Sequence, residues 1–266
     1  MNIAFWNIRC LVDMVRQSEV RHFVRENKIC CLGLLETKVS PHLFGSISSS
    51  LCSGWQWIGN YEHSVRGHIW VGWNPVLVEF KSFYVSSQAI HGMLKVLHIG
   101  LTLYLTAVRP LWSDIIRLNS NLLNDPWLVA GDFNAIRDSS NRLGSPETWL
   151  PSFDEFSECI CQAGLDDLQY VGMRFTWSTS SRVHRKQRKI NRVLVNSKWS
   201  MNYSYSEAAF LPPGILDHSP MLVKMTHPDF NVMVSQVWDT PITSTPMYKL
   251  YTRLKLLKKK LKHLNK

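Results

Sequence analysis

Four polar side chains stand directly after runs of apolar residues, and their types suit the binding of a divalent cation and a phosphate: Asn7, Glu36, Asp132 and Asn134. Binding and catalytic groups often stand where buried strands end. If the four strands are neighbours in one sheet, two carboxylates and two amides converge at one edge. Oxygen ligands of this kind suit Mg²⁺, which takes one or two carboxylates and completes its shell with water and phosphate. Each residue taken alone is also compatible with a strand-ending turn.

The pair Asp217-His218 adds a group that metal binding alone does not need. A histidine beside a carboxylate can hold charge near neutral pH and face a phosphate oxygen. Together with the carboxylates, the pair indicates phosphoryl hydrolysis. The alternative interpretation is a capped turn, since Ser219-Pro220 follows directly.

The apolar patterning predicts the elements that would position these side chains. Strands at Asn2–Ile8 and Ile29–Leu35 flank a helix-like stretch, Asp13–Asn27, as a βαβ opening. Sequential antiparallel strands are predicted at Trp55–Ile58, His68–Trp73, Val76–Tyr84, Leu94–His98 and Leu101–Val108. Later strands are predicted at Trp127–Ala130, Phe175–Trp177, Ile190–Val195 and Met221–Met225, and later helices at Leu111–Leu123 and Ser152–Ala163. This order predicts an α/β fold, a four-layered sandwich of two packed mixed sheets flanked by helices.

Length and composition predict one domain with a tail. A chain of 266 residues that is 45% hydrophobic can bury one sizeable core. We expect a domain at 1–226 and, at 227–266, a linker leading to a basic amphipathic helix over Met247–Leu264. The six cysteines of the chain show no metal-ligand spacing. The sequence also shows neither a secretion signal nor an apolar stretch of about 18 residues. An intracellular protein, nuclear or cytoplasmic and without a membrane span, is expected.

The positive charge is unevenly distributed. The chain carries +10, and eight basic residues with no acidic one lie from Thr240 to Lys266, which leaves +2 for the rest. Between Asp167 and Glu207 there is also no carboxylate but a cluster of cations: Arg174, Arg182, Arg185, Lys186, Arg188, Lys189, Arg192 and Lys198. Such a cluster suits a polyanion, and a solvated basic loop is the alternative. For the tail, the alternative is a solvated helix without a partner.

Six motifs occur in the order seen in the endonuclease/exonuclease/phosphatase superfamily: Trp6-Asn7-Ile8-Arg9, Leu35-Glu36-Thr37-Lys38, Gly131-Asp132-Phe133-Asn134, Arg174-Phe175-Thr176-Trp177, the run Ile190–Asn196, and Asp217-His218-Ser219-Pro220. Together they span residues 1 to about 225. With Trp70–Pro75, they most resemble the apurinic-type endonucleases of plant non-LTR (LINE) retrotransposons. In that family the domain precedes a reverse transcriptase, which we expect to be absent from this chain.

The resemblance implies a role for each residue of the site. Glu36 would bind Mg²⁺, or Mn²⁺, with help from Asn7 and Asp217. Asp132 would orient or deprotonate the attacking water, and Asn134 would hold the scissile phosphate. His218 would stabilise charge on the phosphoryl oxygens. The expected product is a nick in one DNA strand, whose 3′ hydroxyl primes reverse transcription.

Three departures from the family imply an impaired enzyme. Asn191 stands where the family has an aspartate that accepts a hydrogen bond from the histidine; in the serine-protease triad the same change costs roughly 10⁴ in turnover through a wrong tautomer. Arg109-Pro110 stands where the family has a phosphate-contacting tyrosine and a short loop. A Phe-rich stretch after Met225 is also missing.

Three functions therefore remain open. The first is a retrotransposon-derived, metal-dependent DNA endonuclease of weak or no activity. The second is a phosphatase or deadenylase of the same superfamily, using the same metal centre. The third is a non-catalytic nucleic-acid-binding remnant, whose binding would fall steeply with salt. We expect DNA as the partner, a monomer, and no small-molecule cofactor.

Overall fold

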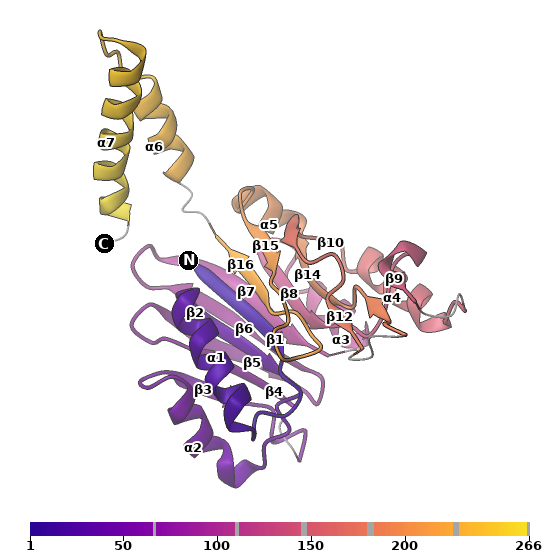
Figure 1. The fold of residues 1–266 in the computed structure, drawn as a ribbon. Helices are drawn as coiled ribbons and strands as arrows, with labels where there is room; N and C mark the ends of the chain where they lie inside the picture. Colours follow the sequence, from indigo (N-terminus) through magenta and orange to yellow (C-terminus); the bar gives the residue numbers. More distant parts are fainter. Residues whose placement is uncertain (66–67, 110–111, 145–147, 180–183, 226–228, 265–266) are drawn as a thin grey trace. The chain divides into compact units, whose positions relative to one another are not determined.

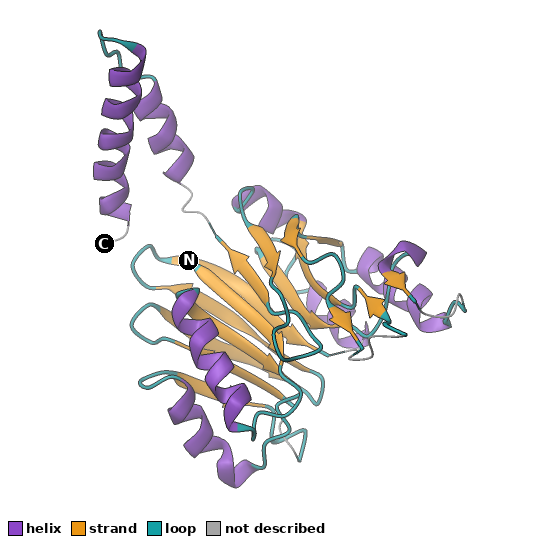
Figure 2. Ribbon diagram, in the orientation of Figure 1, coloured by secondary structure: helices purple, strands orange, loops and turns teal. Residues whose placement is uncertain are grey.

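Two β-sheets form the body of residues 1–224 (Figures 1 and 2). The computed structural model describes residues 1–65, 68–109, 112–144, 148–179, 184–225 and 229–264. In order across the first sheet lie β11 (Tyr170–Gly172), β15 (Glu207–Phe210), β16 (Met221–Lys224), β1 (Asn2–Asn7), β2 (Ile29–Leu35), β4 (Ile69–Trp73) and β3 (Gln56–Gly59). In order across the second lie β10 (Leu165–Asp167), β14 (Asn191–Asn196), β8 (Trp127–Asp132), β7 (Leu101–Val108), β6 (Ala89–Val96) and β5 (Val78–Val85).

Helices cover the outer faces of the two sheets. On the first sheet, α1 (Met14–Glu26) and α2 (Pro41–Leu51) share one buried apolar cluster with β1, β2 and β4 (Figure 1). On the second, α3 (Trp112–Asn119) and α4 (Pro151–Gln162) share another with β8 and β14. A short helix, α5 (Ser197–Asn202), follows β14. The predicted four-layered sandwich of two mixed sheets is therefore confirmed.

In each central strand, alternate side chains face the covering helices and the other sheet. Successive residues of a strand point to opposite faces. In β1, Ala4 and Trp6 belong to the cluster under α1 and α2, so Ile3, Phe5 and Asn7 face the second sheet. A Cβ built on Gly33 of β2 would lie 2.5 Å from the Phe5 ring and 3.4 Å from Ala107 on β7. The missing side chain thus lets the sheets approach closely.

The βαβ opening forms as predicted. Asp13 caps α1 by accepting a hydrogen bond from the Val15 backbone, and Val20, Phe23 and Val24 are the apolar residues that the helix buries. Strands β1 and β2 pair in parallel, with Asn7 opposite Leu35. The helical crossover brings the ends of these strands to the same edge of the first sheet.

Several elements differ from the sequence prediction. The predicted antiparallel run divides between the sheets, because β3 and β4 belong to the first and β5 to β7 to the second. Strand β6 begins at Ala89, before the predicted Leu94, and α3 ends at Asn119, before the predicted Leu123. Helices α2 and α5 were not predicted. The strand predicted at Phe175–Trp177 is only β12 (Trp177–Ser178), which pairs with β13 (Gln187–Arg188) and through it with β9 (Arg142–Leu143) in a small third sheet.

Residues Met225–Lys266 form a second compact unit. It contains α6 (Asp229–Trp238) and α7 (Pro246–Leu264), which contact each other through Lys260 Nζ and Gln236 Oε1 at 3.0 Å. The sequence predicted the second helix but described the segment before it as a linker, because Pro241 and Pro246 interrupt it. Within the described parts of both units, no helix has the length and apolar character required to cross a bilayer.

Candidate active site

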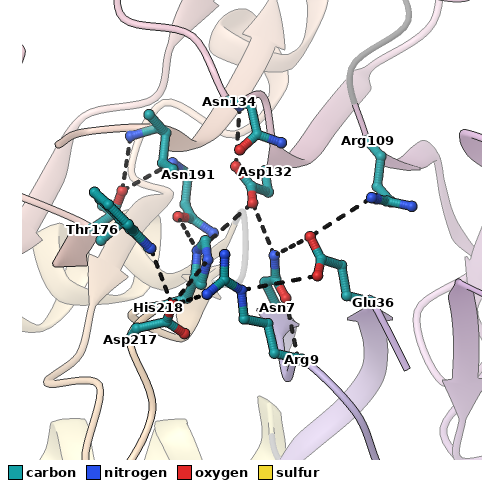
Figure 3. A network of polar contacts seen from close by, with 12 residues as sticks. Asn7, Arg9, Glu36, Arg109, Asp132, Asn134, Thr176, Asn191, Asp217 and His218 are labelled. Carbon is teal, nitrogen blue, oxygen red and sulfur yellow. Dashed lines mark hydrogen bonds and ion pairs between the residues drawn. The ribbon is translucent and has the colours of Figure 1, made fainter. Parts of the chain in front are cut away.

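Strand alternation places three polar side chains in the gap between the two main sheets. Asn7 is the last residue of β1, Asp132 is the last residue of β8, and Asn191 is the first residue of β14. Asp132 and Asn191 lie directly opposite each other in the antiparallel pair of the second sheet. All three are at most 1% exposed, and Figure 3 shows them converging from the two sheets.

The amide of Asn7 joins the two sheets at this point. Its Nδ2 donates to Glu36 Oε1 at 3.2 Å and to Asp132 Oδ2 at 2.8 Å. Its Oδ1 accepts from the backbone N–H of Arg9 at 3.2 Å. Asn7 therefore fixes the spacing between two carboxylates that come from different sheets. The condition stated for the sequence, that these strands be neighbours in one sheet, holds for β1 and β2 but not for β8.

Glu36 stands among three cations. Lys38 Nζ lies 3.4 Å from Oε2, Arg9 Nε lies 3.9 Å from the same oxygen, and Arg109 Nη2 lies 3.7 Å from Oε1. Burial by itself would raise the pKa of the Glu36 carboxyl, but the hydrogen bond from Asn7 and the charges of Arg109 and Lys38 outweigh it and lower the pKa. Glu36 is therefore ionised at neutral pH.

His218 is buried between Asn191 and two carboxylates. Its Nδ1 lies 3.0 Å from Asn191 Oδ1 and 3.7 Å from Asp132 Oδ2, and its Nε2 lies 4.0 Å from Asp217 Oδ2. Burial lowers the pKa of the imidazole although both aspartates act to raise it. Burial likewise raises the pKa of Asp132, against the charge of His218. A neutral imidazole thus stands beside a carboxyl whose basicity is increased.

The segment that carries Asp217 and His218 is hydrogen-bonded to β1 and to β12 of the small third sheet. The backbone carbonyl of His218 accepts from Trp6 Nε1 at 3.0 Å, and Asp217 Oδ2 accepts from Trp177 Nε1 at 3.1 Å. Thr176, next to Trp177, accepts through its hydroxyl from the Asn191 backbone at 2.9 Å. These bonds connect β1, β14 and the small third sheet to the same site.

Backbone strain is concentrated at this site. Among the described residues, six that are not glycine have positive φ, and five of them lie here: Arg9, Cys10, Glu36, Lys38 and Asn134. Left-handed backbone costs a residue with a Cβ about 1–3 kcal/mol and is typical of functional sites. The backbone N–H of Asn134 donates to Asp132 Oδ1 at 3.1 Å. The left-handed backbone at Asn134 therefore places its exposed side-chain amide beside the buried carboxyl of Asp132.

Two buried polar atoms of the site have no hydrogen-bond partner among the described residues: His218 Nε2 and Asn191 Nδ2. Buried polar atoms are nearly always paired in folded proteins, and an unpaired one calls for a functional or structural reason. The imidazole nitrogen is the more informative, because the bond of Nδ1 with the Asn191 oxygen leaves Nε2 as an acceptor.

The residues present fit a hard cation. Glu36 and Asp217 lie on either side of the Arg9 guanidinium, whose Nη1 hydrogen-bonds Asp217 Oδ2 and whose Nε faces Glu36. A positive group thus already stands between two carboxylates. No cluster of three or more His, Cys, Asp and Glu in the described chain is arranged to hold a metal. A divalent ion here would take two carboxylates and complete its shell with water and phosphate, as Mg²⁺ does.

The structure brings all of the sequence-predicted site residues together: Asn7, Glu36, Asp132, Asn134, Asn191, Asp217 and His218 (Figure 3). The prediction gave no role to Arg9, Lys38 and Arg109, which surround Glu36. A weak signal existed, since Arg9 and Lys38 each stand two residues after a predicted site residue. Pro110, part of the predicted departure at Arg109-Pro110, lies outside the described residues.

The basic segment between Asp167 and Glu207 divides into an inward and an outward part. Arg192 is 2% exposed, and its Nη1 donates to both carboxylate oxygens of Asp167 at 2.8 and 3.0 Å; Lys189 is 6% exposed. These two cations are not available to a polyanion. Arg174, Arg185 and Lys186 are exposed, and Arg182 is outside the described residues. The outward cations flank the small third sheet, whose Trp177 contacts Asp217.

Solved structures show which proteins share this fold. The endonuclease domain of TRAS1, a telomere-specific non-LTR retrotransposon, matches with a TM-score of 0.64 and 10% identity over 85% of this chain and 98% of that one. An AP endonuclease from Leishmania major matches at 0.63 and 14%, covering 85% and 88%. A mannosyl-6-phosphatase from Bacteroides thetaiotaomicron matches at 0.56 and 12%, covering 85% and 100%. No family model and no curated protein matches the sequence.

The chain thus shares the α/β sandwich fold of these proteins, and an endonuclease/exonuclease/phosphatase family protein from Bacteroides thetaiotaomicron is among the other structural neighbours. Both nucleases and a sugar phosphatase share it, so the fold by itself does not select a substrate. The particular activity has to be argued from the site.

Proposed function

We propose that this chain is a metal-dependent phosphodiesterase that nicks DNA, with an activity impaired by Asn191 and by Arg109-Pro110 in place of the tyrosine loop, of the endonuclease branch found in non-LTR retrotransposons and most like that of plant LINE elements. The observation that supports it most is the convergence of Glu36, Asp132, Asp217 and His218, four groups from distant segments, at one strained end of the sandwich. Carboxylates beside a neutral imidazole are suited to hydrolysis at a phosphorus centre.

Each side chain has a role in this proposal. Glu36 and Asp217 would hold Mg²⁺ or Mn²⁺, with Asn7 orienting Glu36; the bound ion would supply Lewis-acid stabilisation of the phosphoryl oxygens. Asp132, whose pKa is raised by burial, would orient the attacking water and accept its proton. The exposed amide of Asn134 would donate to the scissile phosphate. His218 Nε2 would face the developing charge once the imidazole carries a second proton.

Charge near the site favours a polynucleotide over a small phosphate ester. The exposed cations Arg185 and Lys186 directly precede β13 of the small third sheet, and Trp177 of the same sheet hydrogen-bonds Asp217. A DNA strand lying across that sheet would reach the site, and the exposed cations would neutralise several of its phosphates. A small phosphate ester would not extend to these residues.

Supercoiled plasmid with Mg²⁺ tests the proposal. The wild-type protein should convert it to the nicked form, and Glu36→Gln, which keeps the shape of the side chain and removes its charge, should abolish nicking. Glu26→Gln is the matched control, because Glu26 is exposed on α1 and away from the site. Nicking that Glu36→Gln leaves unchanged would refute the assignment. Faster release of phosphate from a soluble phosphomonoester than nicking would favour the phosphatase alternative.

Asn191 favours a second candidate, a nucleic-acid-binding remnant without catalysis. Its amide contacts His218 where the family has a charged aspartate, so the charged form of the imidazole lacks that negative neighbour and keeps only Asp132 at 3.7 Å and Asp217 at 4.0 Å. Under this alternative the protein retains DNA in a salt-sensitive manner but does not nick it. The plasmid assay together with a filter-retention assay separates the two candidates.

A further inference from the structure

Arg9 is the one described cation seen to contact two carboxylates of the site. Its Nη1 hydrogen-bonds Asp217 Oδ2, and its Nε lies 3.9 Å from Glu36 Oε2. Lys38 and Arg109 also approach Glu36, at 3.4 and 3.7 Å, but neither forms an ion pair with Asp217. Arg9 therefore stands between the two carboxylates proposed to hold the divalent ion, and the other two cations stand to the side.

A guanidinium and a divalent ion cannot share this position. Both would draw on the same oxygens of Glu36 and Asp217, and their charges repel at contact distance. Glu36 is already ionised and partnered by Lys38 and Arg109, so it does not depend on Arg9 for neutralisation. Exposed ion pairs contribute little to stability, and the Arg9 side chain is 45% exposed. Displacement of Arg9 by an ion is therefore inexpensive.

The backbone at Arg9 allows the side chain to move while the loop stays in place. Cys10 N donates to Glu36 O and Leu11 N donates to Thr37 O, both at 2.8 Å. Arg9 itself is held at φ +44 by the bond from its N–H to Asn7 Oδ1. A guanidinium released from the carboxylates would remain near the site, because the backbone that carries it stays attached through these bonds. Its planar fork matches a phosphate group, to which arginine binds by two parallel hydrogen bonds.

We infer that Arg9 and the divalent ion compete for Glu36 and Asp217, and that Arg9, once displaced, binds a backbone phosphate of the polynucleotide. This inference rests on the proposed function, because it requires the ion site and the strand. It gives Arg9 two partners in turn, so ion binding and strand binding should strengthen each other. Lys38 and Arg109 have no such exchange, since neither lies between the carboxylates.

Mn²⁺ binding, followed by the electron paramagnetic resonance signal of the free ion, tests the first half. Arg9→Ala and Arg9→Gly should bind Mn²⁺ up to about fivefold more tightly than wild type, the ratio expected for removing one exposed competing ion pair. The glycine variant suits the positive φ at this position and keeps the test valid if the alanine variant folds poorly. Arg25→Ala, on α1 and 76% exposed, controls for the lost charge and should leave the affinity unchanged.

Binding of a short fluorescent DNA duplex, measured against salt in EDTA and in Ca²⁺, tests the second half. Arg9→Gly should lower the salt slope by about one in Ca²⁺ and change it little in EDTA, because the guanidinium contacts phosphate only after displacement. Equal Mn²⁺ affinity in wild type and both Arg9 variants would overturn this inference but not the proposed function. An equal loss of DNA binding by Arg9→Gly in EDTA and in Ca²⁺ would do the same. Absence of Mn²⁺ binding in wild type, as in Glu36→Gln, would overturn the proposed function and this inference with it.

Discussion

The side-chain oxygen of Asn191 lies 3.0 Å from Nδ1 of His218. An oxygen at this position selects the tautomer in which Nδ1 carries the proton, which is the one that an aspartate would select. By analogy with the serine-protease triad, the sequence predicted a wrong tautomer. The geometry adds two further differences from an aspartate: the missing negative charge beside the ring, and the Asn191 Nδ2 atom that has no hydrogen-bond partner among the described residues.

Asn191→Asp should raise the nicking rate. The carboxylate would stabilise the imidazolium that forms as His218 takes charge in the transition state, and would remove the unpaired amide nitrogen. Because Asn191 Oδ1 already stands at hydrogen-bond distance from Nδ1 of His218, we expect a gain of about tenfold to a hundredfold, less than the roughly 10⁴ associated with a wrong tautomer. Single-turnover nicking of supercoiled plasmid measures it.

The gain should depend on His218. In the double variant Asn191→Asp, His218→Ala, the added carboxylate has no imidazole to act on, and the rate should equal that of His218→Ala alone. A rate that rises in both backgrounds would show that the aspartate acts through something else, such as Asp132, which lies opposite it in the sheet. A rate unchanged by Asn191→Asp in either background would contradict our account of His218.

The outward cations of the basic segment should determine the salt dependence of DNA binding. Arg185→Ala combined with Lys186→Ala removes two exposed charges beside the small third sheet. If each neutralises one phosphate, the slope of log affinity against log salt should fall by about two. Fluorescence anisotropy between low and physiological salt measures the slope.

The matched control for this pair removes two charges from another face. Arg25→Ala with Lys28→Ala changes the net charge equally, but these residues lie at the end of α1 and just after it. Its slope should match that of wild type. A similar fall in both double variants would mean that DNA is attracted by net charge and not by the small third sheet.

Local pattern predicted most of the strands and the residues at their ends. Asn7 and Asp132 were found because each ends an apolar run, and the period of two then fixes the face to which each side chain points. The class of fold followed from the order of the elements. Two-residue strands such as β9 and β13 could not be predicted, because a segment so short has no measurable period.

The convergence of the site could not be derived from local pattern. Asn7 and Glu36 come from the first sheet and Asp132 from the second, so their proximity depends on how the sheets pack, including the close approach at Gly33. The position of Arg9 depends further on left-handed backbone at Arg9, Glu36 and Lys38, which side-chain periodicity does not specify. Ordered motifs and the family resemblance, not spacing, connected these segments.

His91 should make the fold less stable in acid. It is 4% exposed, its Nδ1 lies 2.9 Å from Thr106 Oγ1, and burial lowers its pKa to about 4. Thr106 Oγ1 also accepts from Trp127 Nε1 at 2.8 Å, so this polar group is fixed inside the core. Between pH 6.5 and about 4 the unfolded chain binds a proton at this histidine that the folded chain does not, so the free energy of unfolding falls as the pH falls.

The whole difference between 6.5 and about 4 corresponds to roughly 3 kcal/mol. Urea unfolding at a series of pH values should show this loss in wild type, and His91→Gln, which cannot titrate, should show a shallower decline from a lower starting stability. His22→Gln, an exposed histidine on α1, should keep the wild-type slope. Identical slopes for wild type and His91→Gln would mean that His91 takes up a proton as readily in the folded protein as in the unfolded chain, and would contradict the prediction.

Gly131→Ala should damage both the fold and the site. A Cβ at Gly131 would lie 1.9 Å from the backbone oxygen of Val108, so β7 and β8 would have to separate. We expect a loss of about 2–3 kcal/mol in unfolding free energy, as overpacking in a core gives, and a lower nicking rate because Asp132 is the next residue. Gly45→Ala is the matched control: nothing lies within 4 Å of its Cβ, and an alanine inside α2 should add about 0.5–1 kcal/mol. If Gly131→Ala unfolds at the same urea concentration as wild type, β7 and β8 can separate around the added methyl group without loss of stability, and the prediction is wrong.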